Sequence, residues 1–107
     1  MRFILFVIHN LNNVAADDEM AKINTFNQKL KNEGYWIAAE GIAHPSEALL
    51  IDNRDGLGRI DKGSVFDGPD FYNGFWIIEV PSREVAEQLA LEGSLACNRR
   101  IELRPYL

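Results

Sequence analysis

The side chains best suited to acid–base chemistry in this sequence are His9 and Asp67. His9 follows the apolar run 3–8, and an imidazole at a strand end can exchange a proton near neutral pH. Its alternative role is structural, as a hydrogen-bond partner of a loop. Asp67 opens an Asp-Gly-Pro turn. Its carboxylate is either a general base or polar anchor at the mouth of a cleft, or an acceptor for nearby backbone N–H groups that fixes the turn. We take both as candidate catalytic residues.

A polar residue in the apolar stripe of a helix is a candidate for ligand binding, and Asn27 is placed in this way. At about 100° per residue, it falls in the middle of the stripe that contains Ala16, Met20 and Ile23. A buried amide needs hydrogen-bond partners. Asn27 therefore either bonds to a neighbouring group or faces a cavity that holds a ligand.

Four further side chains are candidates for substrate binding. Glu40 interrupts an apolar strand; it is either buried, with a raised pKa or an arginine partner, or part of an exposed ion pair. Asp70 and Tyr72 offer polar groups from a loop, or are simply exposed loop residues. Trp76 either lines a flat pocket for an aromatic ligand or fills the core.

Composition excludes several other functions. The sequence has two histidines, far apart, and one cysteine, so we expect no metal site and no disulfide. It lacks a phosphate-binding glycine loop and a dinucleotide fingerprint, so we expect no cofactor. A net charge of −5 argues against nucleic-acid binding. No segment reaches the roughly 20 apolar residues of a membrane span, and the run 3–8 is shorter than a signal-peptide core. We expect a cytoplasmic protein.

The elements that must position these side chains alternate in type along the chain. The length of 107 residues, 47% of them hydrophobic, fits a single domain, 1–107. Apolar patterning predicts strands at 2–9, 35–42, 74–80 and 101–104, and a hairpin at 48–53 and 57–62. It also predicts two helices. The first has about four turns and ends at Gly34, and the second begins after the N-cap Ser82 and stops at Gly93. Residues 65–73 are predicted as a loop. This order predicts an α+β fold, a ferredoxin-like split βαβ sandwich with an extra β-hairpin.

The predicted sheet has two apolar faces and only two helices to cover them. Residues 3–8 are apolar at odd and even positions alike, and so are 75–78. An uncovered face of this size exceeds what soluble monomers usually expose. We therefore expect a homodimer through sheet-to-sheet packing. The alternative is that the extra hairpin folds back over the second face.

Several short segments fall in the order seen in one known family. They are Glu40-Gly41-Ile42, Arg54-Asp55-Gly56, Asp67-Gly68-Pro69, Gly74-Phe75 and the ending Ile101-Glu102-Leu103-Arg104-Pro105. On these segments the chain resembles the YCII-related family over nearly its whole length, and more narrowly its DGPF branch, whose most specific piece here is 65–69. The resemblance implies a dimeric α/β barrel.

The sequence departs from the family pattern in two places. Asp70 stands between Pro69 and Phe71, where the DGPF branch continues directly with Phe, and the loop that leads to Gly74 is shorter. The wider family is associated with a His/Asp pair that resembles an acid–base dyad, and the corresponding positions here hold Ile23 and Asn32. The family's enzymatic activity therefore does not carry over through this dyad.

The combined expectation is a small-molecule-binding homodimer. The ligand is a small apolar or aromatic organic molecule held between helices and sheet, with cofactor-free acid–base chemistry of the isomerase or dehydrochlorinase-like lyase type as the reaction to test. The alternative is a non-catalytic accessory or regulatory module that binds a ligand or a protein.

Overall fold

The computed structural model describes residues 1–13 and 17–107 and contains helices, strands and two short 3-10 turns. The strands are β1 (Arg2–Asn10), β2 (Trp36–Gly41), β3 (Leu49–Asp52), β4 (Arg59–Lys62), β5 (Asp70–Glu79) and β6 (Arg100–Pro105), and the helices are α1 (Glu19–Asn32) and α2 (Arg83–Cys97). Most predicted elements are thus confirmed, with shifted ends. Within the described residues, no helix has the length and apolar character that a membrane crossing requires.

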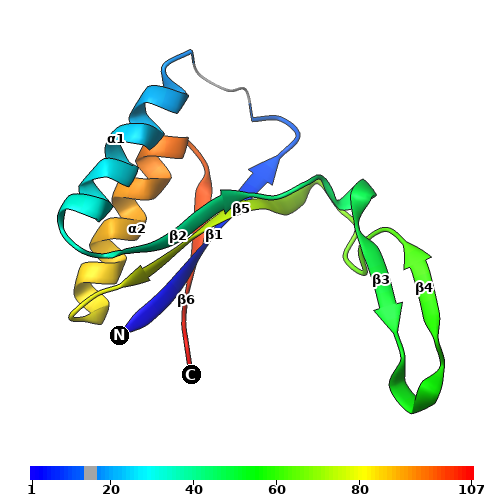
Figure 1. Cartoon of the computed structure of the whole chain (residues 1–107). Coiled ribbons are helices and arrows are strands. Elements are labelled where there is room, and N and C mark those ends of the chain that lie inside the picture. The colour runs from blue at the N-terminus through cyan, green and yellow to red at the C-terminus, as the bar shows by residue number, and fades with distance from the viewer. Residues whose placement is uncertain (14–16) are drawn as a thin grey trace.

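The main sheet has the strand order β2-β5-β1-β6, and each neighbouring pair is antiparallel. Both helices lie on the same face of this sheet (Figure 1). This arrangement is an α+β fold, consistent with the ferredoxin-like class.

The core lies between the helices and the sheet. Phe3 and Leu5 of β1 alternate toward the helices, as do Trp76 and Ile78 of β5, and they pack with Leu30 of α1. The even-numbered residues of β1 point to the opposite face. We call this opposite side, which carries Ile4, Phe6, Ile8, Phe75 and Ile77, the open face, because neither helix covers it (Figure 1).

Helix α1 begins at Glu19, and its apolar stripe is narrower than predicted. Phe26 and Leu30 are buried, but Met20 is largely exposed. The apolar core contacts of α1 come from Phe26 and Leu30, with Ile23 partly buried against the same core. Ala16, the first residue of the predicted stripe, lies outside the described residues.

Helix α2 begins as predicted and ends later than predicted. Ser82 is the N-cap, and its hydroxyl accepts a hydrogen bond from the Val85 N–H at 3.2 Å. Gly93 does not stop the helix. It lies inside α2 where a Cβ would approach the Phe26 ring at 3.2 Å, so its role is close packing of the two helices. The helix instead ends at Cys97, followed by Asn98 in a left-handed conformation.

Strand β5 starts at Asp70, four positions before the predicted start, because its first residues pair with the end of β1. Val7 pairs with Gly74 and Ile8 pairs with Tyr72, so Asn73 forms a β-bulge. The bulge changes the alternation of β5. Asp70 and Tyr72 therefore share the open face with Phe75, although their numbers differ in parity.

The hairpin is confirmed, but it does not fold back over the open face. Strands β3 and β4 form a separate two-stranded sheet, with a turn that places Asp55 and Gly56 at positive φ. The hairpin projects away from the body of the molecule (Figure 1). The open face is consequently uncovered by any described part of the chain.

Candidate functional site

A cavity of about 310 Å³ lies beneath α1, at the side of the sheet formed by β2 and β5. We call it the helix–sheet cavity. Its volume is at the lower end of the range for small-molecule sites. Three of the predicted binding residues, Asn27, Glu40 and Trp76, border it. Its other lining residues are Val7, Met20, Ile23, Ala39, Gly41, Asn73, Gly74, Phe75, Cys97 and Arg99.

Asn27 and Trp76 form the polar centre of this cavity. The Trp76 indole Nε1–H donates to Asn27 Oδ1 at 2.7 Å, and the Trp76 ring meets Phe26 edge-on with ring centroids 5.2 Å apart. Asn27 is therefore bonded to a neighbour through its oxygen, and it also lines the helix–sheet cavity. Within the described chain, Asn27 Nδ2 makes no hydrogen bond and is available to an acceptor on a ligand.

Glu40 is exposed at the edge of the helix–sheet cavity. The structure gives it neither of the two predicted settings, since it is not buried and forms no ion pair with described residues. The backbone around it is closely packed, because a Cβ at Gly74 would lie 3.0 Å from the Glu40 carbonyl oxygen. A glycine at position 74 thus lets β2 and β5 approach each other where they border the cavity.

Arg99 forms a cluster of polar contacts at the end of the cavity nearest the start of α1. Its side chain is 12% exposed and forms an ion pair with Glu19, which is 11% exposed. Arg99 also donates to the Cys97 carbonyl at 2.8 Å and, through Nε, to His9 Nδ1 at 3.0 Å. This cluster was not predicted from the sequence. Its residues come from β1, α1 and the α2–β6 connection, and no local spacing joins them.

His9 is therefore hydrogen-bonded to a charged side chain of the connection between α2 and β6, which matches its structural alternative. Because Nδ1 accepts a hydrogen bond, a neutral His9 carries its proton on Nε2. The His9 ring also contacts Phe71, with ring centroids 5.3 Å apart. The next residue of the cluster, Cys97, is buried, and burial raises the pKa of its thiol, which disfavours a reactive thiolate at neutral pH.

Asp67 lies apart from His9 and from the helix–sheet cavity. It is exposed on the loop between β4 and β5 and does not line the cavity. Within the described chain it also accepts no backbone hydrogen bond, so the predicted turn-fixing role is absent as well. The two candidate catalytic residues are not brought together.

Asp70 and Tyr72 line a different cavity, of about 510 Å³, on the open face at the base of the hairpin. We call it the corner cavity. Asn10 Nδ2 donates to Asp70 Oδ1 at 2.8 Å, and this hydrogen bond and the neighbouring Arg100 lower the pKa of Asp70.

Tyr72 stacks on Phe6, with ring centroids 4.5 Å apart, and donates to Glu102 Oε2 at 2.9 Å. Burial and the Glu102 carboxylate raise the pKa of Tyr72. Tyr72 is therefore a neutral hydrogen-bond donor at physiological pH.

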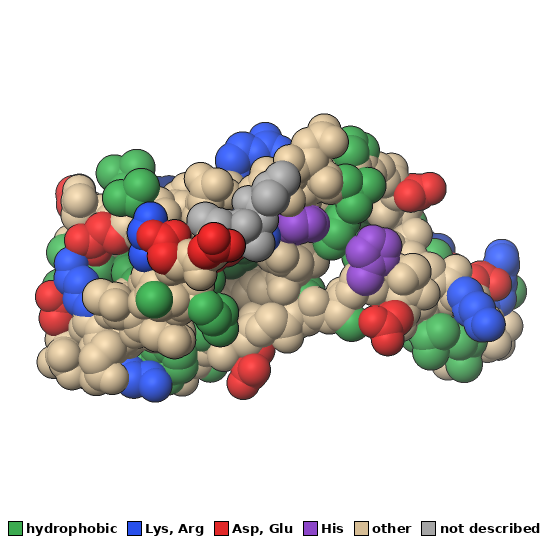
Figure 2. Space-filling view, turned by 90° about the horizontal axis from the view of Figure 1, so that it is seen from above, with side chains coloured by type: hydrophobic (Ala, Val, Ile, Leu, Met, Phe, Trp, Pro, Cys, Tyr) green, Lys and Arg blue, Asp and Glu red, His purple; other side chains and the backbone are tan. Residues whose placement is uncertain are grey.

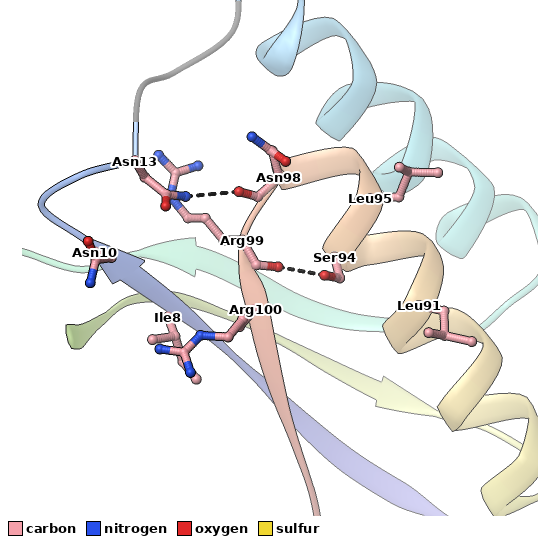
Figure 3. Close-up of a pocket in the computed structure, with 9 residues that line it drawn as sticks. All are labelled: Ile8, Asn10, Asn13, Leu91, Ser94, Leu95, Asn98, Arg99 and Arg100. Atoms are coloured by element: carbon pink, nitrogen blue, oxygen red, sulfur yellow. Dashed lines mark hydrogen bonds between the residues drawn. The ribbon is translucent and has the colours of Figure 1, made fainter.

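A third depression, of about 610 Å³, follows the end of α2 along β6 (Figure 3). Its polar groups bond to one another. Asn13 Nδ2 donates to the Asn98 carbonyl at 2.9 Å, and Ser94 Oγ donates to the Arg99 carbonyl at 2.6 Å. Leu91 and Leu95 form its outer edge (Figure 3). It holds none of the predicted catalytic residues.

No metal site is found among the described residues, which contain no cluster of three or more His, Cys, Asp or Glu side chains. The two histidines, purple in Figure 2, are visible on the same side of the molecule as a hollow between the helical body and the hairpin. Each histidine ring packs against Phe71, and His44 also accepts a hydrogen bond from the Ser46 N–H.

An antiparallel sheet of order β2-β5-β1-β6 with two helices on one face is an α+β fold, consistent with the ferredoxin-like class. The family model of the YCII-related domain matches residues 1–106, so the chain belongs to the YCII-related family. A search of curated proteins gives no significant match.

Proposed function

We propose that this chain is a homodimer that binds a small apolar or aromatic organic molecule in the helix–sheet cavity. The observation that carries the proposal is the Asn27–Trp76 pair inside a cavity of about 310 Å³. The indole fixes the amide through its oxygen and leaves the amide nitrogen for a ligand. Ile23 and Val7 supply apolar walls.

The lining selects the ligand by shape and by one polar group. A volume of about 310 Å³ suits a single ring with a short substituent. Asn27 Nδ2 is a donor, so the ligand would carry a carbonyl, carboxylate or ether acceptor. Arg99 lines the same cavity, but its charge is matched by Glu19, which favours a neutral ligand or a delocalised anion over a compact one.

The geometry favours binding over turnover. His9 Nδ1 already accepts from Arg99, and Asp67 lies on an exposed loop. If the protein is an enzyme, cofactor-free isomerisation or elimination with His9 exchanging the proton is the chemistry to test. Asp67→Asn is the control, since we expect it to leave ligand binding unchanged and stability within about 1 kcal/mol. Loss of turnover with stability intact would make Asp67 the base.

The homodimer would form through the open face, giving a dimeric α/β barrel. Apolar side chains occupy the middle of this face, and ion pairs lie near its rim, including Arg2 with Glu79 and Arg104 with Glu102. An apolar centre with a charged rim is typical of a protein interface. Face-to-face packing of two sheets would bury the centre and leave the ion pairs near solvent.

The test is a binding screen of wild-type protein against a library of aromatic and apolar fragments, read by native mass spectrometry. Asn27→Ala should weaken binding of each hit at least tenfold. Asn24→Ala is the matched control, because Asn24 is an exposed asparagine on the same helix, and it should bind like wild type. No hits, or equal binding by both variants, would contradict a site at Asn27.

An accessory module that binds another protein is the second candidate function. The projecting hairpin and the uncovered sheet face favour it, because both are apolar surfaces without a partner in the described chain. The fragment screen distinguishes these two functions, because a module that only binds another protein is not expected to bind fragments in the helix–sheet cavity.

A further inference from the structure

The hairpin and the open face together form an L-shaped surface. The hairpin leaves the end of the main sheet at β2 and β5 and extends on the side away from the helices (Figure 1). The corner cavity lies where the two arms of the L meet. Its walls come from Ile8 and Tyr72 of the sheet, from Ile42 and Ala48 before the hairpin, and from Phe66 after it.

The two faces of the hairpin differ in chemistry. On one face, Ile51 pairs with Ile60 across the strands, and Leu49 follows on the same side. On the other face, Asp52 bonds to Arg54 and Arg59 bonds to Asp61. The first face is mainly apolar and exposed, with Ile51 and Ile60 at 59% and 67% exposure and Lys62 opposite Leu49 at its end. The second face carries the paired charges, with Leu50 beside them.

An isolated two-stranded sheet is marginally stable in water. Strands β3 and β4 make no extensive contact with another helix or strand among the described residues. Phe66, beside the corner cavity, is 86% exposed, so the apolar surface continues from the hairpin into the cavity. Such a surface is expected to be covered by another molecule.

A second copy of this chain would account for the apolar area, if the dimer interface includes both the open face and the hairpin. Four strands about 4.8 Å apart, each with about six residues rising roughly 3.3 Å, present a face on the order of 400 Å². A stable interface buries roughly 800 Å² on each partner. The open face alone is therefore small for a dimer, and the apolar side of the hairpin with the corner cavity supplies further area that is continuous with it.

We propose that the hairpin is an exchanged arm. In the homodimer, the apolar side of each hairpin packs against the other protomer, and that protomer closes the corner cavity. This inference rests on the proposed dimer through the open face. It adds a second, interfacial compartment with Asp70, Tyr72 and Arg100 as its polar groups, separate from the helix–sheet cavity.

The direct test uses the wild-type chain. A mixture of isotope-labelled and unlabelled protein, allowed to exchange subunits, is measured for filtered nuclear Overhauser effects. Intermolecular effects from the Ile51 and Ile60 methyl groups are expected. Their absence in a protein that is dimeric by sedimentation would overturn the exchanged arm and leave the sheet dimer standing.

The second test is a pair of matched double variants. Ile51→Glu with Ile60→Lys puts opposite charges directly across the hairpin, which preserves strand pairing while it removes the apolar side. Leu91→Glu with Leu95→Lys makes the corresponding change one turn apart on α2, at side chains 67% and 79% exposed. We expect the hairpin variant to raise the dimer dissociation constant at least tenfold and the α2 variant to change it less than twofold.

The outcomes distinguish the arm from the dimer. Equal dissociation constants for wild type and the hairpin variant would overturn the arm alone. If the wild-type chain sediments as a 12.1 kDa monomer at a concentration of about 100 µM, both the dimer and the exchanged arm are overturned.

Discussion

The two faces of the main sheet differ in what covers them and in how their polar groups are paired. The face under the helices is closed by the chain itself, and its polar groups are paired inside the fold, as in the Trp76–Asn27 and Arg99–Glu19 contacts. The open face has equally apolar strands, yet its polar groups form ion pairs near solvent. The two faces are equally apolar, so hydrophobicity alone does not show which one the helices cover. The polar groups do show it, because they are paired inside the fold on the covered face and form ion pairs near solvent on the open face.

The largest expected effect comes from removing one aromatic ring from each face. Trp76→Ala removes a ring that is 4% exposed and leaves the Asn27 oxygen without its donor, so it should lower the free energy of unfolding by about 3–5 kcal/mol. Phe6→Ala, on the open face, should cost about 1 kcal/mol at low protein concentration.

Urea unfolding at several protein concentrations measures both variants. The loss for Phe6→Ala should increase with concentration if a dimer covers the open face, because the folded dimer then gains stability by mass action. Equal losses for the two variants at every concentration would remove the distinction between the faces.

The second effect compares a buried ion pair with an exposed one. Arg99→Met leaves Glu19 nearly buried without its partner and should cost on the order of 3 kcal/mol. Arg2→Met breaks the exposed pair with Glu79 and should cost less than 1 kcal/mol. Thermal unfolding at low and high salt measures both. A small loss for Arg99→Met would mean that the cluster at the end of the cavity is not structural.

The smallest effect is a titration at the corner cavity. The hydrogen bond from Asn10 and the charge of Arg100 lower the pKa of Asp70 in the folded protein. Asp70 therefore stabilises the fold above its unfolded pKa, and this contribution is lost as the pH falls through the lower folded value.

Carboxyl-detected NMR titration measures the Asp70 pKa directly. Asn10→Ala should move it upward, because it removes the largest cause of the shift. Asn12→Ala is the control on the same turn and should leave the Asp70 titration unchanged. An unchanged value in Asn10→Ala would assign the shift to Arg100.

The sequence predicted the order of elements well because hydrophobic alternation and capping are local signals. Ser82 caps α2 as expected, and the two-faced apolar character of β1 correctly indicated a face that the helices leave uncovered. The prediction that Gly93 stops α2 is wrong, because the helix continues to Cys97. A helix-breaking residue and a residue that allows two helices to pack closely look the same along the chain.

The candidate site was predicted in part, and the missing part is tertiary. Asn27 was found because an amide in an apolar stripe is a local anomaly, and Trp76 was found because it is aromatic. Their hydrogen bond joins residues 49 positions apart, and the Arg99–Glu19 pair joins residues 80 positions apart. No spacing rule reaches across such separations, so the partner of each polar group had to come from the structure.

The bulge at Asn73 determines what can be inserted or deleted in β5. In a β5 of the same length without the bulge, Asn73 would lie opposite Ile8, which would turn Phe71 to the open face and Asp70 and Tyr72 toward the helices. A deletion of Asn73, by contrast, would remove the extra residue itself, so Tyr72 would stay opposite Ile8 and both faces would keep their contents. For an evolving sequence, this makes the loss of Asn73 tolerable, whereas a deletion within the regular part of β5 would exchange the contents of the two faces on one side of it.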